Sequence, residues 1–144
     1  MAANALRREA LLDAAIAVLA ERGTRGLTFR AVDANAGTPV GTASNYFANR
    51  DELIAQVFEQ IGVRLAPDPD EVDRLSQRPP SKELFADYVR YIVTRLSAER
   101  AVTIALFELR LEASRNPRIA DLVQNWVSTG FAADVAFNEQ ADLP

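Results

Sequence analysis

The side chains with the most scope for specific hydrogen bonding follow one another closely between residues 40 and 50. Thr42, Ser44 and Asn45 can each donate and accept hydrogen bonds, Tyr46 adds a phenol, and Arg50 adds a permanent positive charge. Hydroxyl, amide and guanidinium groups of this kind bind the base edges and phosphates of nucleic acids. The elements that hold these residues decide whether they can act together.

Turn and cap residues predict a short helix here. Gly37 suits a sharp turn, Thr38 is a good N-cap, and Pro39 then takes the first helical position. The helix lasts less than three turns before Asn49, a second N-cap, and Glu52 is placed to complete a capping box. Such a short helix is unstable alone. An exposed short helix held rigidly by its neighbours is typical of an element that reads a DNA groove.

Two earlier helices supply that support. Residues 7–22 carry apolar side chains mostly on one face, and Gly23 ends this helix. Thr28 caps a second helix that turns Phe29, Val32 and Ala36 inward and leaves Arg30 facing out. The order of helix, helix, turn and short helix is that of the helix-turn-helix group, whose last helix enters the major groove.

Several motifs in the right order resemble the DNA-binding domain of TetR-type transcriptional regulators. They are Arg-Glu-Ala-Leu-Leu-Asp-Ala-Ala at 8–15, Glu-Arg-Gly at 21–23, Leu-Thr-Phe-Arg at 27–30, and Gly-Thr-Ala-Ser-Asn-Tyr-Phe-Ala-Asn-Arg-Asp-Glu-Leu at 41–53. The resemblance covers about residues 7–58. It implies an all-α chain with a three-helix helix-turn-helix domain over residues 1–50 and a helical effector-binding and dimerisation body over residues 51–144. It also implies a homodimeric repressor of an operator in double-stranded DNA.

The resemblance assigns DNA contacts to residues of this sequence. The implied base contacts are Val40, Gly41, Thr42, Ser44 and Asn45. Tyr is usual in the family at position 44, so Ser44 departs from the pattern. The implied phosphate contacts are Thr28, Thr38, Tyr46 and Arg50. Each has an alternative: Thr28 and Thr38 could serve only as caps, and Tyr46 could pack in the core. Asn45 lies at the edge of this face and could contact either phosphate or base. The other four base-facing residues include no bidentate reader, so DNA shape, water and dimer spacing should add to specificity.

The body should hold a small molecule. By the family layout an effector pocket would be lined by Phe85, Tyr88, Ile92, Phe107, Arg110, Leu111 and Trp126. Arg110 would be its polar anchor and the remaining side chains suit an apolar effector. The alternative is that these side chains simply fill the core.

Composition excludes several other functions. The chain of 144 residues has a formal net charge of −4, which argues against a general polyanion binder. It contains neither Cys nor His, which removes disulfides, Ser-His catalysis and the usual zinc sites. We therefore expect no cofactor, no metal and no enzymatic activity, although paired carboxylates leave an enzyme conceivable. No apolar run spans a bilayer and no signal peptide is visible, so the cytoplasm is the expected location.

Further helices should form the body. Residues 50–65 and 81–96 and the segment from Asn116 predict helices, whereas the prolines of residues 66–80 predict a loop. Residues 100–113 fit either a strand or a helix. We favour a helix, because a lone strand would have no partner. Since it is apolar nearly all round, we expect it to be deeply buried.

Length raises a question about dimerisation. The family usually adds two more helices that pair with those of a partner, so this chain is either truncated or pairs by an atypical surface. We favour truncation and expect weak dimerisation.

The alternatives to a ligand-responsive repressor are a helical protein-interaction module without DNA binding, and an activator or a regulator without ligand.

Overall fold

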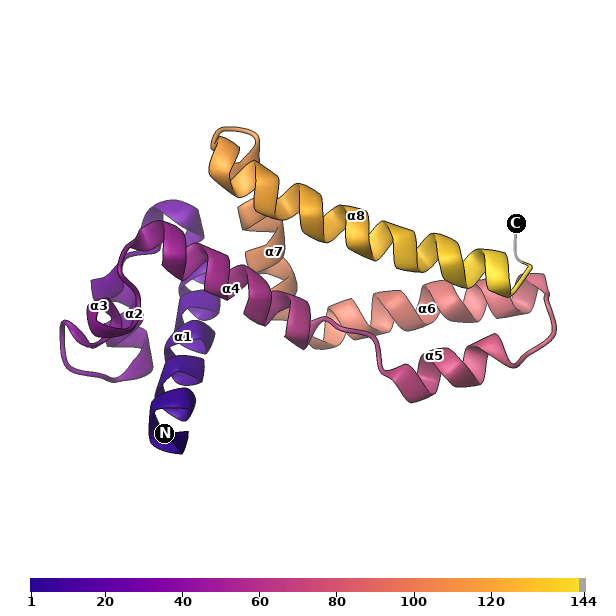
Figure 1. Cartoon of the computed structure of the whole chain (residues 1–144), viewed down its shortest axis with the longest axis horizontal. Coiled ribbons are helices and arrows are strands. Elements are labelled where there is room, and N and C mark those ends of the chain that lie inside the picture. The colour runs from indigo at the N-terminus through magenta and orange to yellow at the C-terminus, as the bar shows by residue number, and fades with distance from the viewer. Residues whose placement is uncertain (143–144) are drawn as a thin grey trace.

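The computed structural model describes residues 1–142, which form eight helices and no strand (Figure 1). The all-α prediction is therefore confirmed. The helices are α1 (Ala2–Gly26), α2 (Phe29–Ala36), α3 (Thr42–Tyr46), α4 (Arg50–Arg64), α5 (Pro69–Ser76), α6 (Lys82–Ala98), α7 (Arg100–Ala113) and α8 (Pro117–Gln140).

The first three helices form one end of the elongated molecule, which we call the head (Figure 1). Within α1, Gly23 leaves helical geometry with φ of +66°, so the regular helix stops where the sequence predicts. The short segment after this kink leads directly into α2. Thr28 caps α2 by accepting a hydrogen bond from the N–H of Ala31 at 3.1 Å, also as predicted.

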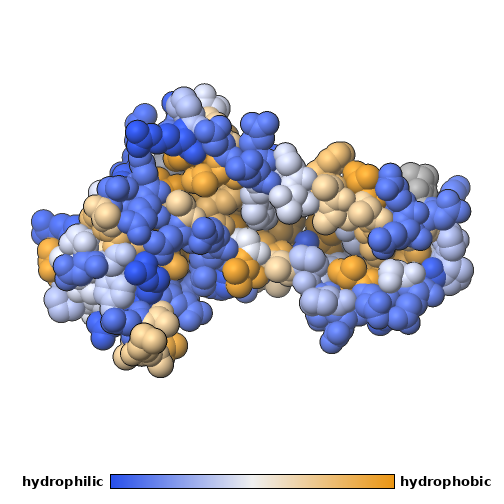
Figure 2. Space-filling model, in the orientation of Figure 1, coloured by the Kyte–Doolittle hydropathy of each residue, from blue (hydrophilic) through white to orange (hydrophobic). Residues whose placement is uncertain are grey.

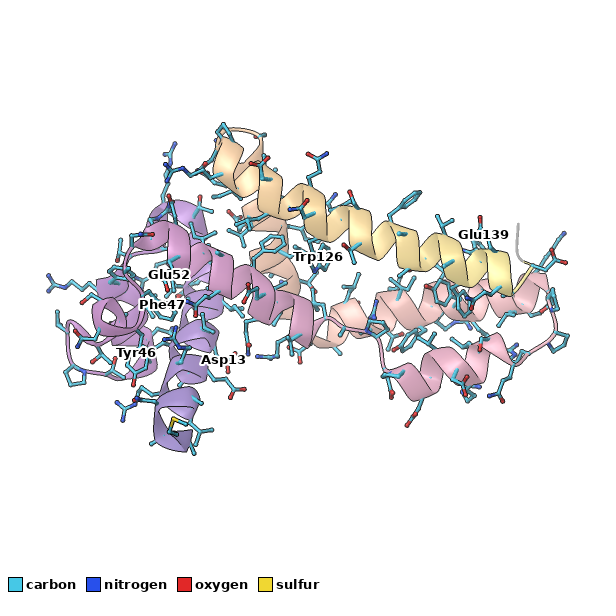
Figure 3. The ribbon with its side chains drawn as sticks, in the orientation of Figure 1. Asp13, Tyr46, Phe47, Glu52, Trp126 and Glu139 are labelled. Carbon is cyan, nitrogen blue, oxygen red and sulfur yellow. The ribbon has the colours of Figure 1, made fainter. Side chains whose placement is uncertain are left out.

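One apolar core runs from the head into the body. It joins buried side chains of α1, α4 and α7, including Leu19, Leu53 and Leu109. The core continues without interruption across the predicted domain boundary between residues 50 and 51. Helices α4 and α7 therefore hold the head against the body. Trp126 of α8 packs on the same core and meets the Phe58 ring edge-on, with 6.1 Å between ring centroids (Figure 3).

A second, smaller apolar cluster lies at the other end of the molecule. It is formed by α5, α6 and α8, which lie alongside one another at that end (Figure 1). Its buried members are Leu75, Leu84, Tyr88, Phe137 and Ala141. Tyr88 stacks on Phe137 with 4.0 Å between centroids, and its hydroxyl donates to Asp134 Oδ1 at 2.6 Å.

Two expectations about the body are wrong. Residues 69–76 form helix α5, because Asp68 caps it and Pro69 occupies the first turn, where a missing N–H is tolerated. Helix α7 is confirmed as a helix but is buried on one face only. Phe107 and Leu111 on its other face are 52% and 60% exposed.

No helix within residues 1–142 combines the length and the apolar character needed to cross a bilayer.

Candidate nucleic-acid interface

The short helix α3 begins later than the sequence predicts. It starts at Thr42 instead of Pro39, and its N-cap is Gly41, whose φ is +97°. Thr38 does not cap this helix. Its hydroxyl instead lies 3.2 Å from Asp33 Oδ1 and 3.4 Å from the Asp33 carbonyl oxygen. The expected helix start at Pro39 is wrong because a buried carboxylate, and not Thr38, organises this turn.

Asp33 is that carboxylate, and it is only 1% exposed. Its Oδ2 accepts the N–H of Gly41 at 2.8 Å, and its Oδ1 accepts the N–H of Ala43 at 2.7 Å. These N–H groups belong to the first turn of α3, which has no capping side chain of its own. Asp33 therefore caps α3 from a different helix, α2.

Sequence reasoning missed Asp33, although a signal was present. Phe29, Val32 and Ala36 are predicted to point inward, and a residue four positions after Phe29 lies on that same face. A carboxylate at an inward position must find donors, because an unpaired buried charge is costly. The donors nearest along the chain are the N–H groups of the turn that follows.

The predicted base contacts lie close together in the chain, and all of them reach the surface. Val40 is 78% exposed, Ser44 and Asn45 are exposed, and Gly41 and Thr42 are half-buried. A methyl group added at Gly41 would meet nothing within 4 Å, so the space over this position is open. The Thr42 hydroxyl donates to the Pro39 carbonyl at 2.7 Å, and the Ser44 hydroxyl donates to the Gly41 carbonyl at 2.9 Å. Both hydroxyl oxygens then have lone pairs left for an external donor.

Tyr46 lies at the contact between α3 and α1 (Figure 3). It is half-buried, which places it between the two alternatives of surface contact and core residue. Its hydroxyl donates to Asn4 Oδ1 at 3.0 Å. Arg8 donates to the Tyr46 carbonyl at 3.2 Å and to Gln56 Oε1 at 2.8 Å, and its guanidinium lies 5.6 Å from the Tyr46 ring centroid. Asn4 and Arg8 thus hold Tyr46 in place, and the sequence did not single them out.

Arg50 and Thr28 are neighbours. Arg50 opens α4 and donates to the Thr24 carbonyl at 2.6 Å and to the Leu27 carbonyl at 3.3 Å. These bonds hold the start of α4 against the segment that leads into α2. Both Arg50 and Thr28 line a hollow of about 420 Å³ at this junction. The two predicted phosphate contacts thus lie beside each other at the N-terminal end of α2.

The local charge of the head is positive. Arg25, Arg30 and Arg50 are exposed, while Asp33, the one acid among residues 24–50, is buried and hydrogen-bonded to neutral donors. The surface around the turn therefore presents arginine charge although the chain as a whole is acidic. Such local charge attracts phosphate and makes the attraction sensitive to salt.

The seven predicted effector residues do not meet in one place. Tyr88 and Ile92 belong to the second cluster, where Tyr88 is buried, and Phe85 is exposed. Burial and the hydrogen bond to Asp134 raise the pKa of Tyr88 above its ordinary value. Trp126 packs on the main core. Two hollows of about 420 and 430 Å³ lie at the junction of head and body, and none of the seven residues lines either of them.

The outer face of α7 holds the other three predicted effector residues. Phe107 and Leu111 are exposed there, and the exposed Arg110 places its guanidinium 6.0 Å from the Phe107 ring centroid. The effector pocket stays a prediction, and a ligand touching all seven residues would require a different arrangement of the body helices.

Comparisons with known proteins cover both parts of the chain. Residues 11–57 match the family model described as bacterial regulatory proteins, tetR family, and residues 80–144 match the model described as tetracyclin repressor-like, C-terminal domain. These families are regulators and not enzymes. No curated protein sequence matches the chain.

Solved structures of similar fold include a multidrug binding protein. The protein EbrR complexed with ethidium superposes with a TM-score of 0.70 at 27% identity, covering 94% of this chain and 75% of EbrR. A member of the TetR family from Streptomyces coelicolor A3 gives a TM-score of 0.64 at 25% identity, covering 92% of this chain and 83% of that one.

Proposed function

Because the chain belongs to the tetR family of bacterial regulatory proteins and is a DNA-binding transcriptional regulator, we propose that it is a ligand-responsive repressor that binds a palindromic operator as a homodimer. The observation that carries the proposal is the turn and helix from Val40 to Asn45, anchored from inside by Asp33 and open on its outer side. A protein that regulates transcription works where the bacterial DNA is, so we place it in the cytoplasm.

Helix α3 reads base edges in the major groove. Val40 contacts an apolar group, most simply the methyl group of thymine. Because the hydroxyls of Thr42 and Ser44 already donate within the chain, their oxygens accept from base amino groups, which adenine and cytosine present in this groove. The open space over Gly41 lets the helix approach closely, and Asn45 lies at the edge of the same surface.

Phosphates are bound on two sides of α3. Thr28 and Arg50 form one anchor, where the N-terminal end of α2 adds its own preference for an anion. Tyr46, held by Asn4 and Arg8, forms the other. Thr38 lies close to Asp33 and contacts a phosphate only if its hydroxyl turns outward.

Dimerisation and ligand response belong to the body. Figure 2 shows apolar surface over the middle of α8, and the large apolar side chains exposed on that helix are Phe131 and Val135. A second copy of the chain that covers this surface would remove it from water. An effector bound between the body helices then changes the spacing of the two heads, so that they no longer match two half-sites. EbrR binds ethidium, which makes ethidium a first effector to test.

Variants at the phosphate anchors test DNA binding directly. Tyr46→Phe removes one hydroxyl and Arg50→Ala removes one charge, so both should weaken binding to duplex DNA, and Arg50→Ala should lower the slope of log affinity against log salt by about one. Arg74→Ala is the matched control, because Arg74 is an exposed arginine of α5 paired with Glu71. Anisotropy of a labelled duplex at several salt concentrations measures both effects.

The same experiment separates the proposal from the interaction module. A module without DNA binding would show equally weak affinity for the parent chain and all three variants. The ligand response is tested in a second titration, in which a bound effector should release the labelled duplex and ethidium is the first candidate. If ethidium or other aromatic molecules bind without changing DNA affinity, the chain is a regulator without a ligand switch.

A further inference from the structure

Arg95, on helix α6, is half-buried and has two buried nitrogen atoms that nothing in the described chain satisfies. Its Nε and Nη1 atoms are buried, and no hydrogen-bond acceptor within residues 1–142 reaches either of them. Burying a charged donor without a partner is among the costliest arrangements in a protein interior. Unpaired buried groups of this kind call for an explanation, and a bound ligand is one.

The surroundings of Arg95 are aromatic and apolar. Its guanidinium lies 5.3 Å from the centroid of the Tyr91 ring, and the Tyr91 hydroxyl is itself fixed by the N–H of Asp68 at 2.7 Å. Tyr91 and Ile92 pack on the second apolar cluster, whereas Leu96, the residue after Arg95, packs on the main core. Arg95 therefore belongs to the part of α6 where the two clusters meet, between the head and the distal end of the body.

An acidic side chain next to Tyr88 is already engaged. Asp134 of α8 accepts a hydrogen bond from the hydroxyl of Tyr88 at 2.6 Å. Tyr88 lies one turn before Tyr91 on α6. Arg78, which precedes α6, and Arg90, on α6, differ from Arg95 because both pair with Asp87. Among these three, only Arg95 has no acidic partner within residues 1–142.

We propose that Arg95 is the anchor for an anionic effector. The effector is a small organic acid with an apolar or aromatic body, and the oxygens of its acid group accept the N–H groups that the fold leaves unpaired. The inference rests on the proposed ligand response and names the chemical class of the ligand. It also moves the polar anchor from Arg110, which is exposed on α7, to Arg95.

Chemistry favours an oxyanion over other ligands. A neutral ligand would bring no negative charge to pair with the guanidinium, and a cation would be repelled by it. An oxyanion forms charge-assisted hydrogen bonds, which are stronger than neutral ones and gain from exclusion of water. The Tyr91 ring, 5.3 Å from the guanidinium, stabilises its positive charge, and the acid group of the ligand adds the hydrogen-bond acceptors that the ring cannot supply.

The test uses three naphthalenes that differ only in charge: 2-naphthoate, 2-naphthol and 2-naphthylmethylammonium. Titration of the full chain is followed by thermal shift and by the NMR signal of the Arg95 Nε–H. Only 2-naphthoate should stabilise the chain and move that signal. Benzoate and decanoate, as smaller and longer acids, extend the search to other shapes of the apolar body.

Substitutions of Arg95 test whether the binding of 2-naphthoate depends on this residue. Arg95→Met should lose 2-naphthoate affinity by about tenfold or more, while the unliganded variant melts at the same temperature as the parent or higher, because the buried nitrogen atoms without a partner are gone. Arg95→Lys keeps the charge without the planar fork and should bind with intermediate affinity. Arg90→Met, on the exposed side of the same helix, should change nothing in binding.

Several results would overturn the inference. Binding of the acids that is equal in the parent chain and in Arg95→Met would do so, and so would 2-naphthol binding as tightly as 2-naphthoate. Inorganic sulfate saturating the Arg95 signal as readily as any organic acid would indicate a mere counter-ion. DNA affinity measured on the same samples separates the anionic-effector inference from the proposed repressor function. If the chain binds DNA but no acid binds at Arg95, only the inference about the effector is wrong. If an acid binds at Arg95 without changing DNA affinity, the proposal of a ligand-responsive repressor is wrong.

Discussion

The Oδ1 atom of Asp33, in α2, accepts the backbone N–H of Ala43, in α3, at 2.7 Å. This bond and its companion from the N–H of Gly41 satisfy the start of a helix that is only five residues long. A helix of that length does not persist by itself. Its orientation on the head is therefore set by a side chain of the preceding helix.

Asp33→Ala should lower the free energy of unfolding by about 2 kcal/mol, because it leaves the N–H donors of Gly41 and Ala43 without an acceptor. Asp33→Asn retains one acceptor and should lose less. Urea denaturation measures both, with Asp73→Ala as control, since Asp73 is exposed on α5. At temperatures where Asp33→Ala remains folded, its DNA affinity should still fall, because α3 is no longer held in place. An Asp33→Ala chain with parental stability and DNA binding would show that Asp33 does not position α3.

Gly41 and Gly130 should respond to alanine in opposite directions. A Cβ would meet nothing within 4 Å at either position, so contacts do not distinguish them. Gly41 has a φ of +97°, which alanine adopts only with strain, so Gly41→Ala should destabilise the chain by about 1 kcal/mol or more. Gly130 lies inside α8, where alanine is the better helix former, so Gly130→Ala should stabilise it by up to about 1 kcal/mol. Thermal unfolding of the two variants checks the signs, and equal signs would contradict the argument.

The buried Tyr88 should make stability fall in alkaline solution. Burial, and then the hydrogen bond to Asp134, raise the pKa of Tyr88 above its ordinary value of 10.0. Above that pH the unfolded chain has lost the Tyr88 proton while the folded chain keeps it, so the unfolded state binds fewer protons and the free energy of unfolding decreases as pH rises. This contribution is fully present below about pH 10. Tyr88→Phe should show a shallower decrease above that pH, and identical profiles would contradict the assigned shift.

The apolar surface of α8 should control self-association. Phe131 is 68% exposed, and a negative charge at that position would oppose its burial against a second copy. We expect the parent chain to dimerise weakly and Phe131→Glu to remain monomeric in sedimentation velocity. Val63→Glu, at another exposed apolar side chain, is the control. A tight dimer at low micromolar concentration, or one that Phe131→Glu leaves intact, would contradict this view of the dimer.

The sequence predicts the helical class and the supports of the head because these depend on local signals. The positive φ of Gly23, the Thr28 cap and the capped start of α4 all rest on residues within a few positions of one another. Even the capping box differs in one detail: the Glu52 carboxylate accepts the N–H of Ala48 and not that of Asn49. Helix α5 is missed because Pro69 is interpreted as a helix breaker, although a proline after Asp68 suits a helix start equally well.

What the sequence does not predict depends on contacts between distant elements. The bond from Arg8 to the Tyr46 carbonyl joins residues 38 positions apart, and no periodicity reveals it. Likewise, the apolar pattern of residues 100–113 cannot say that only one face of α7 is covered, because that depends on how α1 and α8 pack. The unpaired Arg95 is visible only once the body is folded.

Selection of bound duplexes from a random DNA pool, read out by sequencing, tests whether α3 reads a DNA sequence. We predict enrichment of a two-fold palindrome whose half-sites each present the thymine methyl and amino-bearing bases that Val40, Thr42 and Ser44 can contact. Enrichment should be lost in Asp33→Ala. No enrichment by the parent chain at low salt would contradict the account, because the anchored α3 would then not be reading DNA.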